Sequence, residues 1–445
     1  MGKYFGTDGV RGQANTDLTL DMAVRIGQYL GWYYGQNGTQ ARILIGKDTR
    51  LSGDMLELGL AAGAISTGAH VWLLGVCPTP AVSFLIRDKG FDCGIMVSAS
   101  HNPYTDNGIK IFNHEGKKMP EDVLLEIEKC MDHEIDVPAA TGEKVGTCTP
   151  WHEGLQIYID WLEETVPLDL AGMKIAVDLA NGSAVSTAVK TLTDMGADVH
   201  ELAGDPNGIN INYHCGSTHP EALKEFVVEE GCDLGLAFDG DADRLIAVAA
   251  DGTEINGDYI LYMIGRHMKE QGKLNKNMVV TTVMANLGLY KGLQASGIDY
   301  IQTPVGDKYV FEEMEKNDYR IGGEQSGHII FYEHMVTGDG LLTALKLLET
   351  LKDSGKTIPE LSEGLFIYPQ LLVNVHVKDK KTVLDDAGLQ KVLDDVNEKL
   401  AGNGRILVRP SGTEPLIRVM VEAQTDALCA QYVKEVTDYI ESRNF

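Results

Sequence analysis

The sequence predicts an α/β protein of three consecutive βαβ-based domains with mixed or parallel sheets, followed by a smaller α+β domain at the C-terminus. Three stretches follow one plan: a β-rich run, a turn, an amphipathic helix, a glycine and a second β-rich run. They cover residues 42–76, 173–202 and 278–303. Units of this kind form parallel sheets that helices cover. The 445 residues leave room for three or four domains that each bury a core.

The first unit begins with the strand-forming run 43–45, after which Ser52 is the expected N-cap of a helix. Gly68 is expected to end that helix, because glycine adopts the left-handed conformation that closes helices. A second strand should follow at residues 71–74.

The other two units repeat this order of elements. In the second, residues 174–177 predict a strand and Gly196 ends the helix. In the third, residues 279–283 predict a strand and Gly297 ends the helix. Each unit should therefore contribute two neighbouring parallel strands to a sheet.

The last eighty residues or so break this pattern. Residues 371–377 alternate as a strand, and a charged helical stretch covers 383–400. Two further strands, at 405–408 and 417–421, flank a turn. This order predicts a small α+β domain that ends in a helix.

We place the domain boundaries near Trp151, Asn256 and Tyr368, where one pattern gives way to the next. Four domains are therefore expected, at residues 1–151, 152–255, 256–367 and 368–445.

The composition limits the partners of this chain. A formal net charge of −27 repels phosphate backbones and anionic lipids, so we expect neither nucleic acid nor membrane as a partner. No apolar run approaches membrane-spanning length, and the first residues contain no apolar h-region of the kind that a secretory leader has. Seven cysteines without C-x-x-C spacing indicate free thiols in the cytoplasm. An anionic substrate would need a locally basic cleft.

Residues 94–110 hold the most informative motif. The apolar run 94–97 predicts a short buried strand, and a Ser/Asn/Pro cluster after it predicts a turn. Ser100 is expected to be displayed on this turn, sharing one loop with His101 and Lys110. An ordinary serine-rich turn is the alternative.

A second apolar strand, residues 234–238, runs directly into Asp239, Asp241 and Asp243. Alternate spacing keeps three carboxylates on one side of an extended turn, and hard oxygen ligands suit Mg²⁺ or Mn²⁺. A phosphatase that uses Asp239 as its nucleophile remains an alternative, as does a solvated acidic turn. A calcium EF-hand loop is excluded, because it would need Gly and Glu where Arg244 and Ala250 stand.

Three further motifs carry polar side chains among glycines. Residues 322–328 offer a carboxylate, a hydroxyl and an imidazole to a hydroxylated ligand, although a surface loop would also explain them. Residues 409–415 offer a guanidinium, hydroxyls and exposed backbone N–H groups to a phosphate, and a plain hairpin is the alternative. Residues 5–12 place Arg11 between glycines, which indicates a guanidinium in a fixed orientation.

These five motifs, in this order over the whole chain, closely resemble the α-D-phosphohexomutase family. The resemblance implies a four-domain enzyme with one loop from each domain around a central cleft. It implies that Ser100 carries a phosphoryl group and holds one Mg²⁺ per chain together with Asp239, Asp241 and Asp243.

The resemblance also implies roles for the other motif residues. It makes Lys110 a general acid or base and places three groups around the transferring phosphoryl group, namely His101, Arg11 and Arg244. Three residues would bind the sugar hydroxyls: Glu324, Ser326 and His328. Four would bind the phosphate that is not reacting: Arg409, Ser411, Gly412 and Thr413.

The implied substrate is a hexosamine phosphate. Glucosamine 6-phosphate would become glucosamine 1-phosphate through a 1,6-bisphosphate, which is both intermediate and activator, and would supply amino-sugar nucleotides and cell-wall precursors. Mannose or glucose phosphates are alternative substrates, because no residue pattern identifies a partner for the 2-amino group. A phosphatase or a sugar-phosphate-binding regulator is a further alternative, and the oligomeric state is not predicted.

Two positions depart from what the resemblance leads us to expect. Ala242 stands where a second glycine is usual, and we expect a negative φ there. Lys308 stands where arginine is commoner, which keeps the charge but loses bidentate phosphate geometry.

Overall fold

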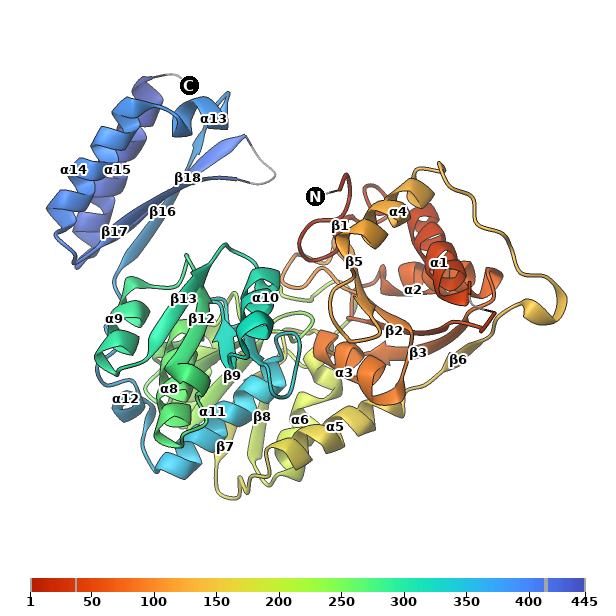
Figure 1. The fold of residues 1–445 in the computed structure, drawn as a ribbon. Helices are drawn as coiled ribbons and strands as arrows, with labels where there is room; N and C mark the ends of the chain where they lie inside the picture. The colour runs from red at the N-terminus through yellow and green to blue at the C-terminus, as the bar shows by residue number, and fades with distance from the viewer. Residues whose placement is uncertain (1, 37, 412–414, 444–445) are drawn as a thin grey trace. The chain divides into compact units, whose positions relative to one another are not determined.

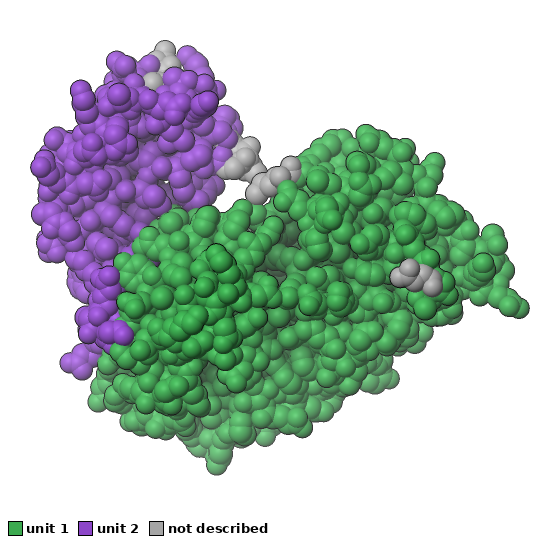
Figure 2. Space-filling view, viewed as in Figure 1, with its two compact units in different colours: residues 1–284, 298–362 green, residues 285–297, 363–445 purple. Residues whose placement is uncertain are grey.

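The computed structural model describes residues 2–36, 38–411 and 415–443. The chain forms two compact units, which Figure 2 colours separately. The first comprises residues 1–284 and 298–362, and the second comprises 285–297 and 363–445. The segment 285–297 thus belongs by its contacts to the second unit. The division into four domains remains a prediction.

The first unit begins with a mixed sheet of six strands: β1 (Val10–Gln13), β2 (Arg42–Lys47), β3 (His70–Val76), β4 (Cys93–Val97), β5 (Asp106–Asn113) and β6 (Cys148–Pro150). Their order is β1-β5-β4-β2-β3-β6. β2 is parallel to β3 and β4, as the first βαβ unit predicts. β5 is antiparallel to β4 because it returns without a crossover helix.

Helices accompany this sheet: α1 (Leu20–Gly35), α2 (Gly53–Ser66), α3 (Thr79–Lys89) and α4 (Glu121–Met131) (Figure 1). Ser52 precedes α2 as predicted, but its side chain makes no capping hydrogen bond. Its hydroxyl instead accepts a hydrogen bond from Asn107 Nδ2 at 2.9 Å. The sheet and α1, α2 and α4 enclose one hydrophobic core.

The second sheet contains five strands: β7 (Lys174–Asp178), β8 (Asp198–Leu202), β9 (Leu234–Phe238), β10 (Leu245–Ala249) and β11 (Glu254–Ile255). β7, β8 and β9 are parallel, whereas β10 returns antiparallel to β9 through the tight loop that bears the three aspartates. The accompanying helices are α5 (Gly154–Thr165), α6 (Ala188–Asp194) and α7 (Glu221–Glu230).

The third sheet contains four strands: β12 (Met278–Thr282), β13 (Asp299–Thr303), β14 (Ile321–Gly323) and β15 (Ile329–Phe331). β12 is parallel to β13 and β14, and β15 is antiparallel to β14. Four helices belong to this part of the chain: α8 (Gly257–Glu270), α10 (Asp307–Asn317), α11 (Gly340–Ser354) and α12 (Ile358–Leu361). All three sheets are mixed, which confirms the predicted fold class.

The second unit has an antiparallel sheet of three strands: β16 (Gln370–His376), β17 (Arg405–Pro410) and β18 (Leu416–Glu422). Its helices are α9 (Leu287–Ala295), α13 (Lys380–Leu384), α14 (Ala387–Leu400) and α15 (Asp426–Ser442). The helical stretch predicted over 383–400 is confirmed for residues 387–400, but a break at Asp385 and Asp386 separates it from α13. Asp385 closes α13, and the side chain of Asp386 caps α14 by accepting from the Leu389 N–H at 2.7 Å.

Helix α9 is the predicted crossover helix of the third βαβ unit, yet its partners lie in the C-terminal unit. Asn286 exchanges two hydrogen bonds of 2.9 Å with the backbone of Tyr368. The Leu287 N–H donates to Glu422 Oε2 at 2.9 Å. Gly288 lies so close to Phe366 that an added Cβ would be 1.8 Å from the Phe366 carbonyl oxygen.

No described helix is both long enough and apolar enough to cross a membrane.

Glu128 of α4 anchors the N-terminal segment within the first unit. Its buried carboxylate accepts hydrogen bonds from the backbone N–H groups of Lys3, Tyr4 and Phe5 at 2.8, 2.6 and 2.8 Å. Bonds from N–H groups to a carboxylate are among the stronger hydrogen bonds of proteins. They fix where the glycine-rich segment that follows enters the fold.

We expect Glu128→Ala to lower the free energy of unfolding by about 2 kcal/mol, because three backbone N–H groups, that of Phe5 buried, lose their acceptor. Urea denaturation measures the change. Glu126→Ala is the matched control, since Glu126 lies on the same helix and forms an exposed ion pair with Lys129. Equal unfolding free energies for both variants would contradict the anchoring role.

Candidate active site

Ser100 lies in the first unit, just after β4, and is buried rather than displayed. Only 1% of its surface is exposed, which corrects the expectation from the sequence. Its Oγ donates to Asp239 Oδ2 at 2.6 Å. The aspartate loop covers it so closely that a Cβ at Gly240 would lie 2.4 Å from the Ser100 carbonyl oxygen. Ser100 also has a φ of 54°, a left-handed conformation that stores strain at a functional position.

Arg50, which follows β2, holds the Ser100 loop in place. The guanidinium is buried and donates through Nη1 and Nη2 to four backbone carbonyls of the loop, at 2.8, 2.9, 2.6 and 3.2 Å: those of Ser100, Asn102, Pro103 and Asp106. Buried carbonyl groups need such partners. The sequence reasoning missed Arg50, although the charged residues directly after a buried strand were a usable signal.

Asp48 completes this support. Its Oδ2 accepts from Arg50 Nε at 2.9 Å and from Ser98 Oγ at 2.6 Å. Ser98 Oγ in turn accepts the Ser100 N–H at 2.9 Å. The backbone of the reacting loop is thus fixed by a buried ion pair.

Asp239, Asp241 and Asp243 form a buried cluster after β9. One oxygen of each lies within 4.8 Å of the others, and the Oδ1 atoms of Asp241 and Asp243 accept no hydrogen bond from the described residues. Burial, and next the charges of Asp243 and Asp241, raise the pKa of Asp239 well above its usual value. Buried carboxylate oxygens that accept no hydrogen bond and repel one another fit a hard divalent cation.

Two helix N-termini meet the aspartate loop. At the start of α3, Thr79 donates its N–H to the Asp241 carbonyl at 2.9 Å and its hydroxyl to the Asp241 carboxylate. At the start of α11, the Gly340 N–H donates to the Ala242 carbonyl at 3.0 Å. The positive ends of both helix dipoles favour an anionic loop here. Thr79 and Gly340 were not predicted, because nothing near them in the sequence points to Asp241.

Ala242 has a φ of 55°, so the negative φ expected there is wrong. The turn between β9 and β10 is tight, and the position requires the left-handed conformation that glycine adopts freely. An alanine there adds backbone strain next to the carboxylate cluster.

Lys110 lies in strand β5 and not on the serine loop, which corrects the expectation of one shared loop. It pairs with Met96 of β4 in the antiparallel ladder. Its buried Nζ lies 2.7 Å from Asp241 Oδ2, 3.2 Å from Asp243 Oδ2 and 3.1 Å from Asp8 Oδ2. Burial lowers the pKa of Lys110, but these three carboxylates outweigh it and raise the pKa.

Three further predicted residues surround Ser100. His101 Nδ1 lies 3.4 Å from Ser100 Oγ and 3.3 Å from Arg244 Nη1. Burial and the charges of Arg244 and Arg11 lower the pKa of His101 to about 4, so its ring is neutral. The Nε atoms of Arg11 and Arg244 are buried without a hydrogen-bond partner among the described residues. Two guanidiniums therefore keep donors available for an anion.

The hairpin of β14 and β15 brings the motif of residues 322–328 close to the carboxylate cluster. Glu324 Oε1 accepts the Gly306 N–H at 3.2 Å, and Ser326 Oγ is buried without a partner among the described residues. His328 Nδ1 lies 3.6 Å from Asp243 Oδ1, which joins this hairpin to the carboxylate cluster.

The protonation of His328 is subject to opposing effects. Burial lowers its pKa, whereas the charges of Asp243 and next Asp307 raise it. The Gly338 N–H, however, donates to Nε2 at 2.9 Å, and that nitrogen then needs a lone pair. We assign the neutral ring with its proton on Nδ1, because a fixed backbone donor already occupies Nε2.

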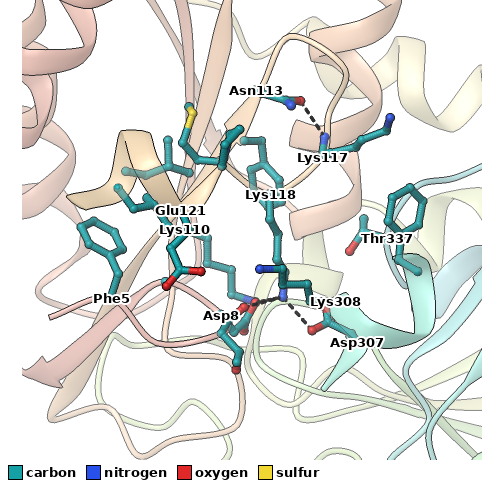
Figure 3. A pocket seen from close by; sticks show the side chains of 18 of the residues that line it. Phe5, Asp8, Lys110, Asn113, Lys117, Lys118, Glu121, Asp307, Lys308 and Thr337 are labelled. Carbon is teal, nitrogen blue, oxygen red and sulfur yellow. Dashed lines mark hydrogen bonds and ion pairs between the residues drawn. The ribbon is translucent and has the colours of Figure 1, made fainter. Parts of the chain in front are cut away.

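A cavity of about 540 Å³ lies beside these groups within the first unit (Figure 3). Asp8, Lys110, Lys118, Asp307 and Lys308 are among the residues that line it. Lys118 Nζ lies 2.9 Å from Asp8 Oδ1 and 2.7 Å from Asp307 Oδ1. The sequence reasoning assigned no role to Asp8, Lys118 or Asp307.

The predicted phosphate-binding motif, residues 409–415, belongs to the second unit. Arg409 of β17 faces Arg418 of β18, and burial together with Arg418 lowers the pKa of Arg409. Ser411 is buried, and its carbonyl accepts Lys380 Nζ at 2.8 Å. Gly412 and Thr413 lie outside the described residues. A hollow of about 490 Å³ beside Ser411 is lined by three lysines that the sequence reasoning missed: Lys378, Lys380 and Lys381.

We expect calorimetry to show one tight Mn²⁺ or Mg²⁺ site per chain. Asp241→Asn should weaken that binding at least about tenfold, because one of three anionic ligands is lost. Asp251→Asn is the matched control, since Asp251 is exposed and follows the next strand. A metal affinity that Asp241→Asn leaves unchanged would remove the cluster as a metal site.

Four family models match the chain in order. They describe the α/β/α domains I, II and III and the C-terminal domain of phosphoglucomutase/phosphomannomutase, and they match residues 2–137, 156–252, 256–367 and 372–439.

Curated relatives match the chain over its full length. A phosphoglucosamine mutase of Shouchella clausii is 51% identical over 443 residues, covering 100% of this chain and 99% of the relative. A phosphoglucosamine mutase of Lachnospira eligens is 50% identical over 448 residues, covering 100% of both.

Solved structures share the fold. A phosphoglucomutase/phosphomannomutase family protein of Burkholderia thailandensis has a TM-score of 0.78 at 23% identity, covering 98% of this chain and 96% of that one. An N-acetylphosphoglucosamine mutase of Aspergillus fumigatus, solved with GlcNAc-6P and magnesium, has a TM-score of 0.71 at 16% identity. That alignment covers 100% of this chain and 96% of the other.

Proposed function

The chain belongs to the phosphoglucomutase/phosphomannomutase family, and on that premise we propose that it interconverts glucosamine 6-phosphate and glucosamine 1-phosphate. It is an enzyme of the phosphohexomutase type, an isomerase that transfers a phosphoryl group within its substrate. Relatives with about half of their residues identical over the full chain are phosphoglucosamine mutases. The acidic composition supports a cytoplasmic reaction without nucleic acid or membrane partners.

One observation carries the proposal. The hydroxyl of Ser100 lies 2.6 Å from Asp239, inside a cluster of three carboxylates, with the ammonium of Lys110 on the other side of Asp241. A serine so placed suits phosphoryl transfer, because a cation at the carboxylates and fixed positive side chains can neutralise the charge of the equatorial oxygens. An acidic surface turn would not bury all three aspartates.

Asp239, Asp241 and Asp243 would hold Mg²⁺ together with the phosphoryl group on Ser100. When bound, the ion neutralises charge on the transferring phosphoryl group. Arg50 and Asp48 fix the backbone of Ser100 during the transfer, so that attack occurs from a defined direction.

Transfer begins when the sugar O1 attacks the phosphorus on Ser100. The new bond joins O1 to phosphorus, the bond from phosphorus to Ser100 Oγ breaks, and the proton of O1 passes to the protein. Lys110 is the group proposed to exchange that proton, and it accepts it as the neutral amine, which a divalent cation at Asp241 and Asp243 would favour by repelling the ammonium. Arg11 and Arg244 would bind the phosphoryl oxygens through Nε donors that the described residues leave unused, with the neutral His101 beside them.

The product of this step is the 1,6-bisphosphate. It must turn around, so that the 6-phosphoryl group returns to Ser100 and glucosamine 1-phosphate is released. Glu324, Ser326 and His328 would bind hydroxyls in both orientations, and the Oγ of Ser326, which has no hydrogen-bond partner among the described residues, supports this role. Arg409 and Ser411, with Gly412 and Thr413, would bind the other phosphate, which the lysines near Ser411 also favour.

We expect Ser100→Ala to lower kcat by at least about a thousandfold with the fold intact, because the side chain carries the transferred group. A coupled assay with glucosamine 6-phosphate and a trace of the 1,6-bisphosphate measures this. Intact-mass spectrometry should show one labile phosphate on the wild type and none on the variant. Ser442→Ala, an exposed serine, is the control, and near-normal turnover by Ser100→Ala would refute the assignment.

Arg409→Ala should raise KM for glucosamine 6-phosphate about tenfold or more and change kcat less, because a guanidinium that grips the non-reacting phosphate contributes mainly to binding. Arg443→Ala serves as the control, since its side chain is more than half exposed at the end of α15. If KM stays the same in Arg409→Ala, the C-terminal motif has no part in phosphate binding.

A further inference from the structure

Asp8 is the one carboxylate beside Lys110 that the proposed mechanism does not use. Among the described residues, three carboxylates form ion pairs with Lys110 Nζ: Asp241 at 2.7 Å, Asp8 at 3.1 Å and Asp243 at 3.2 Å. Asp241 and Asp243 belong to the metal cluster. Asp8 therefore remains available to meet a substrate that reacts next to Lys110.

Asp8 is a carboxylate at the pH of the cell. Burial disfavours its ionised form, but the charges of Lys110, Lys118 and Arg11 outweigh burial and hold the pKa of Asp8 well below its usual range. Arg11 and Lys110 contact Oδ2, and Lys118 contacts Oδ1. A carboxylate has about four acceptor positions, so three cations leave one position on Oδ1.

The surroundings of Asp8 already bind a primary ammonium group. Lys118 Nζ lies 2.9 Å from Asp8 Oδ1, 2.7 Å from Asp307 Oδ1 and 3.1 Å from the Thr7 carbonyl oxygen. Figure 3 shows the three side chains meeting at the cavity wall. This part of the cavity therefore suits the group –NH₃⁺, and a substrate in the cavity can reach it.

In glucosamine, the 2-amino group lies close to the reacting oxygen O1. In glucosamine the amino group and O1 are on adjacent carbons, and two gauche substituents on adjacent carbons lie about 3 Å apart. An O1 that exchanges its proton with Lys110 lies within about 3 Å of Nζ. The 2-ammonium group is then within reach of Asp8, which is 3.1 Å from the same Nζ.

We propose that the carboxylate of Asp8 binds the 2-ammonium group of glucosamine 6-phosphate while O1 receives the phosphoryl group, and that it thereby selects glucosamine over glucose. This inference rests on the proposed function and names the specificity residue of that reaction. Glucose has a neutral hydroxyl at the same carbon and gains at most an ordinary hydrogen bond from Asp8. An ion-pair hydrogen bond is stronger, and the difference corresponds to about 10- to 100-fold in kcat/KM.

The test compares kcat/KM for glucosamine 6-phosphate and glucose 6-phosphate in the wild type, Asp8→Asn and Glu115→Gln. We expect Asp8→Asn to lower the ratio of glucosamine to glucose about 10- to 100-fold. Glu115→Gln is the matched control, because Glu115 lines the same cavity but forms its ion pair with Lys117 instead of Lys110 or Lys118. Its ratio should stay within about twofold of the wild type.

A merely structural role would give a different result. If Asp8 only oriented Arg11 and Lys110, Asp8→Asn would slow both substrates equally and leave the ratio unchanged, which would overturn the proposal. A wild type that is inactive on glucosamine 6-phosphate would instead refute the proposed function itself. The two failures are therefore distinguishable.

A second measurement needs no variant. The 2-amino group has an ordinary pKa of about 8, whereas the hydroxyl of glucose does not titrate in this range. In the wild type, the ratio of glucosamine to glucose should fall at least about tenfold between about pH 6.5 and pH 9.5. Arg11, Lys110, Lys118 and Asp307 act on both substrates and cancel in the ratio. A ratio that does not change with pH would overturn the proposal even if Asp8→Asn failed to fold.

Discussion

The site depends above all on the buried ammonium of Lys110, which lies among carboxylates from two separate loops. It joins the N-terminal segment, through Asp8, to the aspartate loop after β9, through Asp241 and Asp243. The buried carboxylates of Asp239, Asp241 and Asp243 cannot all stay ionised side by side without cations. One lysine in strand β5, which pairs with a neighbouring strand on each side, lets the aspartate loop and the serine loop approach closely enough for Ser100 to contact Asp239.

The sequence predicted the site best where the functional residues directly follow a recognisable strand. Ser100 after an apolar run, and alternate aspartates after another, were visible because strand and functional group are adjacent. Arg50 and Thr79 were missed for the opposite reason. Arg50 acts on a loop that is 50 to 56 positions further along the chain, and Thr79 bonds an aspartate 162 positions away. The burial of Ser100 was mispredicted on the same ground, since the loop that covers it comes from another sheet.

For the fold, local patterns found the strands and helices but not all of their partners. The runs at 43–45 and 279–283 are β2 and β12, within one or two residues at each end. Helix α9 was predicted from its sequence, yet that sequence does not show that its contacts lie with Tyr368 and Glu422. The division of residues 383–400 into two helices depends on Asp386 as a cap, which a window of charged residues obscures.

The two-segment composition of the second unit has a consequence for synthesis on the ribosome. Helix α9 leaves the ribosome long before its partners, because Leu287 bonds to Glu422, 135 positions later, and Asn286 bonds to Tyr368, 82 positions later. These partners are therefore absent from the chain while its last third is still being made. Contacts of such high sequence separation form slowly, and exposed apolar segments are sites of aggregation. Chaperone binding to the nascent chain is thus expected to concentrate around residues 285–297.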